Sequence, residues 1–110
     1  MSYRVLLTHS AERDLEEIHD YIVGNDTQAN ADYVLKKLME VTGALASFPG
    51  RGSYPKELLL LLLGIRDHRQ AHFKPYRLIY RVIGKQVFIY MIADGRRDMQ
   101  TLLSRRMLGA

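Results

Sequence analysis

Apolar and polar side chains alternate along residues 76–83 and again along residues 86–94, with Gly84 and Lys85 between the two runs. A period of two is typical of β-strands, and a two-residue loop that begins with glycine favours a tight type II′ turn. The pattern therefore predicts a β-hairpin in which Ile83 faces Gln86. The register that follows pairs Val82 with Val87, Arg81 with Phe88, Tyr80 with Ile89, Ile79 with Tyr90, Leu78 with Met91 and Arg77 with Ile92.

This register sorts the side chains of the hairpin onto two faces. The first is apolar apart from two phenol hydroxyls, and we expect it to lie against the core. It holds Tyr76, Leu78, Tyr80, Val82, Val87, Ile89, Met91 and Ala93. The second holds Arg77, Ile79, Arg81, Phe88, Tyr90 and Ile92. Because burial of an unpaired guanidinium costs several kcal/mol, we expect the second face to be solvated or to meet a partner.

The first half of the chain has helical spacing instead. After a short strand at residues 3–7, Thr8 or Ser10 offers a helix cap, and one apolar stripe contains Ala11, Leu15, Ile18 and Ile22. A second, longer stripe runs from Ala31 to Leu45, after the turn and cap residues 25–27. Two helices joined so briefly are expected to form a hairpin.

The remaining elements complete one α+β domain over residues 1–110. Residues 49–55, rich in glycine and proline, are expected to be a connector. Residues 65–73 are expected to contain a polar strand, and residues 99–108 a short final helix. The expected order is β-α-α-β-β-β, with the helix hairpin packed on a small, mainly antiparallel sheet.

Charge is distributed unevenly along the chain. The net charge is +4, but residues 1–50 hold four basic and eight acidic groups, whereas residues 51–110 hold twelve basic and four acidic groups, a net of +8. Such a cationic half suits an anionic partner, either nucleic acid or an acidic protein. The chain has no cysteine, which suits a reducing compartment, and no apolar run of signal-peptide or membrane-spanning length. We expect a cytoplasmic protein.

Few residues suggest enzyme chemistry. His68 and His72 have the spacing of helical zinc ligands, but on a strand they lie about 13 Å apart, too far to share one ion. We therefore expect no metal site, and the absence of nucleotide-binding or hydrolase motifs gives no reason to expect a cofactor. The carboxylates of the first helix are expected to be solvated.

A group of arginines and aromatic residues remains as a candidate binding surface. It comprises Arg77, Arg81, Arg96, Arg97, Arg105 and Arg106, with Tyr90 and Phe88. Guanidinium forks and aromatic planes together suit phosphates or single-stranded bases, and they suit an acidic protein equally well. A plain nucleic-acid-binding domain is therefore one hypothesis from the residues alone.

Six consecutive leucines, residues 58–63, show no period and are hard to bury all at once in a domain of this size. Exposed contiguous apolar surface is rare in monomers. We expect part of this run, represented by Leu58, Leu60 and Leu62, to be covered by a partner helix.

In order and spacing, several segments resemble the RelE/ParE superfamily of bacterial toxins from type II toxin–antitoxin modules, over essentially the whole chain. The segments are the opening RVLLTHSAERDLEEIHDYI, the Phe48-Pro49 break, Gly64-Ile65-Arg66, the strand YRLIYRV and the closing ADGRRDMQTLL. The resemblance implies a toxin that is neutralised by a cognate ParD-like or RelB-like antitoxin.

Within the superfamily the sequence is nearer to the ParE-like toxins, which poison DNA gyrase, than to the RelE-like toxins, which cut mRNA in the ribosomal A site. Arg77 and Arg97 match two arginines of the RelE-like pattern. However, His68 and Gln70 stand where that pattern has lysines, and Leu103 stands where it has a late tyrosine. The resemblance therefore implies a gyrase inhibitor with no catalytic residue. The alternative is a ribosome-dependent endonuclease that uses Arg77, Arg97 and His68, or His72 as the base.

Overall fold

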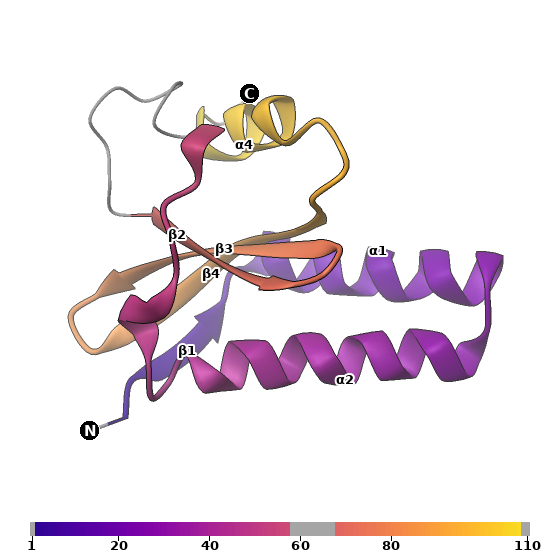
Figure 1. Ribbon diagram of the computed structural model, residues 1–110, viewed down its shortest axis with the longest axis horizontal. Coiled ribbons are helices and arrows are strands. Elements are labelled where there is room, and N and C mark those ends of the chain that lie inside the picture. Colours follow the sequence, from indigo (N-terminus) through magenta and orange to yellow (C-terminus); the bar gives the residue numbers. More distant parts are fainter. Residues whose placement is uncertain (1, 58–67, 109–110) are drawn as a thin grey trace.

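The computed structural model describes residues 2–57 and 68–108 (Figure 1). In chain order the elements are β1 (Arg4–Leu7), α1 (His9–Asn25), α2 (Gln28–Ala44), the 3-10 helix η1 (Pro49–Arg51), β2 (His68–Phe73), β3 (Tyr76–Ile83), β4 (Gln86–Asp94) and α4 (Met99–Leu108). The predicted α+β fold, including the helix hairpin and the final helix, is confirmed.

The four strands form one sheet in the order β1-β4-β3-β2. β1 runs parallel to β4, and the other two pairs are antiparallel. Figure 1 shows α1 and α2 side by side on one face of the sheet and α4 on the other. The sheet is therefore the middle layer of the molecule.

Threonine caps begin both long helices. The Thr8 hydroxyl accepts a hydrogen bond from the Ala11 amide at 3.2 Å, and the Thr27 hydroxyl accepts one from the Asn30 amide at 3.0 Å. Each bond satisfies a backbone donor that has no partner within its own helix. The caps fix where α1 and α2 begin, and the expectation of Thr8 as a capping residue is confirmed.

The predicted hairpin register is confirmed near the turn and wrong beyond it. Gly84 has the positive φ, 59°, that a tight hairpin turn needs. The pairs from Ile83 with Gln86 to Tyr80 with Ile89 are those predicted. The next pair is Ile79 with Met91, so Tyr90 is an extra residue on β4, a β-bulge.

The bulge exchanges the faces of the residues that follow it. Ile92 joins the core beneath α1 and α2, whereas Met91 and Ala93 join a second cluster with Ile79 on β3 and Met99 and Leu103 on α4. The expectation that Met91 and Ala93 share a face with Leu78 is therefore wrong, as is the placement of Ile92 beside the arginines. The second face is also partly covered by α4 rather than fully solvated, because the bulge supplies apolar residues for this helix.

Candidate functional site

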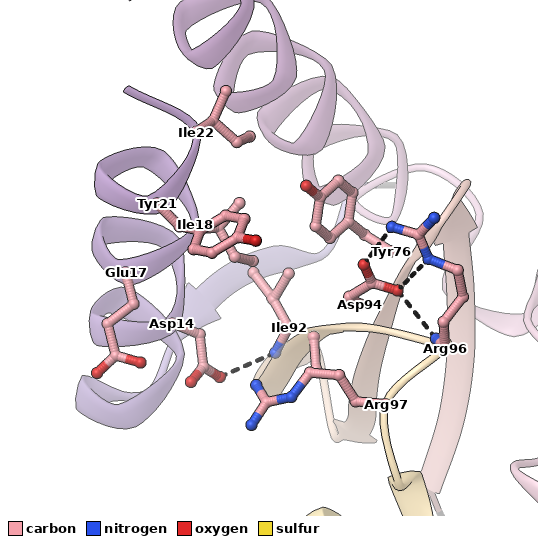
Figure 2. A pocket seen from close by; sticks show the side chains of 11 residues that line it. Asp14, Glu17, Ile18, Tyr21, Ile22, Tyr76, Ile92, Asp94, Arg96 and Arg97 are labelled. Carbon is pink, nitrogen blue, oxygen red and sulfur yellow. Dashed lines mark hydrogen bonds and ion pairs between the residues drawn. The ribbon is translucent and has the colours of Figure 1, made fainter. Parts of the chain in front are cut away.

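A carboxylate on α1 and an arginine on α4 meet at the bulge. β1 pairs with β4 only as far as Ile89. Beyond that point Asp14 Oδ2 accepts a hydrogen bond from the Ile92 amide at 2.9 Å (Figure 2). Arg106 donates to both Asp14 oxygens at 3.0 Å and to the Tyr90 carbonyl oxygen at 2.6 Å. The pair thus satisfies backbone groups at the edge of β4 and ties α4 to α1.

The same region borders a cleft of about 500 Å³ between α1 and the end of β4, shown in Figure 2. Its lining is apolar at Ile18, Ile22 and Ile92 and polar around the rim. The rim residues are Asp14, Glu17 and Tyr21 from α1, Tyr76 from β3, Asp94 from β4, and Arg96 and Arg97 from the following turn. The α1 wall of the cleft therefore carries two carboxylates, whereas the opposite wall, with Asp94, Arg96 and Arg97, is net basic.

A local ion pair shapes the basic wall. Asp94 Oδ1 accepts hydrogen bonds from the Arg96 amide at 2.9 Å and from Arg96 Nε at 3.0 Å, and Oδ2 accepts one from Nη2 at 2.6 Å. These bonds from Arg96 hold the pKa of Asp94 below its ordinary value. Arg96 nevertheless remains 78% exposed, so one side of its guanidinium is open to solvent.

Gly95 lies directly against another arginine. A Cβ at this position would lie 2.7 Å from Cδ of Arg77 and 3.1 Å from the Pro75 carbonyl oxygen. Real Cβ atoms essentially never come within 3.0 Å of such an atom, so a side chain here would force Arg77 to shift, and the contact with Pro75 would also be tight. The glycine of the GRRD segment is therefore needed for packing.

Arg77 is held by a bidentate ion pair at the other side of this turn. Its Nη1 and Nη2 donate to the two Glu57 carboxylate oxygens at 2.9 Å each, and its Nε donates to Gln70 Oε1 at 2.9 Å. The Arg77 and Glu57 side chains are 13% and 15% exposed. Hydrogen bonds from Arg77 lower the pKa of Glu57. Arg77 shares a face with Arg81, as predicted, but its charge is neutralised within the molecule.

Arg81 and Tyr90 lie further along the same face of the sheet. Arg81 pairs across the strands with His68 on β2 and with Phe88 on β4. The rings of His68 and Tyr90 have centroids 5.5 Å apart. All four side chains are half-buried. The histidine, arginine and tyrosine that the sequence suggested for chemistry or binding are thus neighbours here.

The structure therefore divides the predicted arginine group. Arg96 and Arg97 line one cleft, where Arg96 also pairs with Asp94. Arg77 and Arg106 are engaged by Glu57 and Asp14, and Arg81 lies with Tyr90 on the sheet. Arg105 is exposed on α4 beside a shallow hollow that contains Asp98 and Thr101. Leu58, Leu60 and Leu62 fall outside the described residues.

Sequence reasoning did not assign roles to Asp14, Glu57 and Gln70. A signal for Asp14 exists in the spacing, because it lies three residues after Ala11 and four before Ile18 and so flanks the buried stripe of α1. No comparable signal marks Glu57, whose partner is twenty residues away in the sequence.

In the part of the chain that the structure describes, no cluster of three or more metal-binding side chains occurs. In the same part, no helix has the length and apolar character needed to cross a membrane.

Residues 5–99 match the sequence pattern of one protein family, which is described as "ParE toxin of type II toxin-antitoxin system, parDE". The chain belongs to the ParE toxin family. Toxin ParE3 of Caulobacter vibrioides is 27% identical to this ParE-family chain over 103 residues, which cover 94% of this chain and 97% of the relative. The resemblance stated from the sequence is confirmed.

Solved structures share the fold of this ParE-family toxin. A chain of the chromosomal ParDE system from P. aeruginosa has a TM-score of 0.69 at 20% identity, covering 84% of this chain and 96% of that one. A chain of the toxin–antitoxin complex RelBE2 from Mycobacterium tuberculosis has a TM-score of 0.62 at 24% identity, covering 86% and 99%. A mutant of E. coli RelE in the free state has a TM-score of 0.54 at 18% identity, covering 93% of each chain. At these identities the likeness concerns the fold alone.

Proposed function

We propose that this ParE-family toxin inhibits DNA gyrase, is neutralised by a cognate antitoxin in the cytoplasm, and does not itself cleave nucleic acid. The family match and the basic C-terminal half support this proposal. Among the predicted target-binding residues, Arg96, Arg97 and Arg105 are exposed at the turn after β4 and on α4, where a large anionic target has access to them.

The choice against a nuclease rests on the contacts and burial of the residues that stand at positions of the RelE-like pattern. Gln70 uses its amide oxygen to accept hydrogen bonds from Arg77, which is itself engaged by Glu57. Leu103, at the position of the late tyrosine, is fully buried in the cluster under α4. A phosphorane that develops on this face would therefore find a neutralised guanidinium and, at position 103, no acid or base.

A ribosome-dependent endonuclease is the second candidate, because one observation favours it. His68 lies beside Tyr90 and Arg81, which places a potential base close to a cation. Mapping of mRNA ends after induction in cells separates the two proposals: new ends at ribosomal A-site codons support the nuclease, and their absence supports the inhibitor.

The direct test of the main proposal is a supercoiling and DNA-cleavage assay with purified gyrase. The full-length toxin at micromolar concentration is expected to block supercoiling and to increase the amount of cleaved DNA. An unchanged supercoiling rate together with unchanged cleavage would reject gyrase as the target.

Neutralisation by an antitoxin gives a second prediction. We propose that Leu58, Leu60 and Leu62 contact an antitoxin helix. We also propose that the antitoxin presents acidic residues to the basic half of the toxin. Complex formation should then become faster as ionic strength falls, because electrostatic steering acts mainly on the association rate. Stopped-flow association at low and high salt measures this effect.

A further inference from the structure

Three pairs, each of an aromatic ring and a cation, lie within or beside the segment of residues 46–54, which crosses one end of the sheet. Lys85 Nζ lies 5.4 Å from the Tyr3 ring centroid, Arg51 Cζ 5.1 Å from that of Phe48, and Arg69 Cζ 4.7 Å from that of Tyr54. We name these six residues the aromatic strip. None of them was assigned a function from the sequence, in which residues 49–55 were expected to be only a connector.

Backbone hydrogen bonds place the strip along one end of the sheet. The Tyr3 amide donates to the Ala46 carbonyl oxygen at 2.7 Å on the β1 side, and the Gln70 amide donates to the Ser53 carbonyl oxygen at 2.7 Å on the β2 side. The segment between these two bonds therefore passes from the first strand of the sheet to the last. In Figure 1, η1 lies at the same end as the β3–β4 turn, which carries Lys85.

Side chains of the sheet hold this segment in place. The Tyr80 hydroxyl donates to the Pro49 carbonyl oxygen at 2.7 Å and accepts from the Gly52 amide at 3.1 Å. Arg69 donates to the Gly52 carbonyl oxygen at 2.9 Å and to the Tyr54 hydroxyl at 3.1 Å. A segment anchored by this many bonds loses little conformational entropy when a ligand binds.

The strip presents apolar rings and positive charge to solvent. Phe48 and Tyr54 are 56% and 41% exposed, and Arg51 and Lys85 are exposed beside them. No acidic residue occurs in residues 41–56 or 68–93, which include five of the six members. Exposed rings alone would suit an apolar partner, but rings paired with cations that have no carboxylate partner among the described residues suit the stacked bases and phosphates of an unpaired strand.

We propose that the aromatic strip binds single-stranded DNA. The choice of DNA over RNA rests on the proposed function, because a gyrase complex contains DNA. The strip is separate from the arginines at the end of β4 and on α4, so it gives the toxin a second contact with the nucleic acid of its target.

The test is fluorescence anisotropy of a labelled oligothymidylate of about 12 nucleotides with the full-length toxin at 50 mM salt. Arg51→Glu should weaken binding about tenfold or more, since it replaces a favourable phosphate contact with repulsion. Phe48→Leu should weaken it about fivefold or more, whereas Phe48→Tyr should bind like the wild type, because base stacking needs a ring. Both sites are exposed, and far-UV circular dichroism should show unchanged folding of all three variants.

Lys36→Glu is the matched control for charge, since Lys36 is exposed on α2, outside the strip, and it should change binding less than twofold. Wild-type protein that does not bind the oligonucleotide, or Arg51→Glu and Phe48→Leu proteins that bind it normally, would overturn the proposal. Preference for an oligouridylate by more than tenfold would overturn the choice of DNA.

The gyrase assay separates this inference from the proposed function. Inhibition of gyrase without oligonucleotide binding would reject the strip as a DNA-binding surface and keep the proposed function. Strip-dependent binding without gyrase inhibition would reject the proposed function and keep the strip as a DNA-binding surface.

Discussion

The helices on the two faces of the sheet are held by different kinds of contact. Within the described residues, twelve buried apolar side chains form the cluster between the sheet and the α1–α2 hairpin, whereas five form the cluster beneath α4. On the α4 side, two ion pairs supplement this smaller cluster: Arg106 joins α4 to Asp14, and Arg77 joins the sheet to Glu57. Arginines that the sequence suggests for a target thus stabilise the face where apolar contact is limited.

The largest effect is expected from breaking the contact at the bulge. Asp14→Ala should destabilise the protein by about 3 kcal/mol, because it leaves Arg106 without its carboxylate and the Ile92 amide without its acceptor. Urea unfolding at neutral pH measures the change. Glu16→Ala, an exposed acidic position on the same helix, should change stability by less than about 0.5 kcal/mol. Equal stability of the two variants would mean that α4 does not depend on this pair.

A smaller effect is expected from the second ion pair. A double-mutant cycle with Arg77→Ala and Glu57→Ala should give a coupling free energy of about 2 kcal/mol, because both side chains are mostly buried and the contact is bidentate. A coupling near zero in urea unfolding would show that Arg77 does not depend on Glu57, and would favour a role for Arg77 in target binding.

The dependence of stability on acid pH gives a second test of the ion pair between Arg77 and Glu57. Hydrogen bonds from Arg77 lower the pKa of Glu57 in the folded protein, so this carboxylate contributes stability above its ordinary pKa of 4.5 and loses it as pH falls through the lower folded value. Glu57→Gln should therefore lose less stability than the wild type on acidification from pH 7 to below pH 4.5. Thermal unfolding across this range measures the difference. An unchanged pH profile would contradict the assignment.

The smallest effect on stability is expected at the exposed arginines. Arg97→Ala and Arg105→Ala should each change the free energy of unfolding by less than about 0.5 kcal/mol, because both side chains are exposed. On the proposed function, each should raise the toxin concentration for half-inhibition of gyrase about tenfold. Lys36→Ala should change neither quantity. Normal inhibition by both arginine variants would remove them from the target surface.

The sequence predicted the elements well because their signals are local. The stripe of α1, its Thr8 cap and the Gly84 turn all depend on residues close together in the chain. The bulge at Tyr90 could not be predicted in the same way, because residues 87–93 contain no glycine or proline and are apolar on both faces, so either register buries suitable side chains.

The candidate site was predicted less well, for a related reason. The arginines are evident from composition, but whether each faces solvent or a carboxylate depends on contacts between distant parts of the chain. Asp14 and Arg106 are 92 residues apart, and Glu57 and Arg77 are 20 apart. Charge counted along the sequence therefore overstates the charge that the toxin presents to a partner.

The single additional residue in β4 also constrains how this strand tolerates changes in length. Removal of the codon for Tyr90 would abolish the bulge but would still leave Met91 opposite Ile79 and Ile92 opposite Leu78, so both apolar clusters would keep their residues. What the additional residue supplies is its carbonyl oxygen, which accepts the hydrogen bond from Arg106 on α4. Relatives in which the bulge has been lost should also differ in how their final helix is attached.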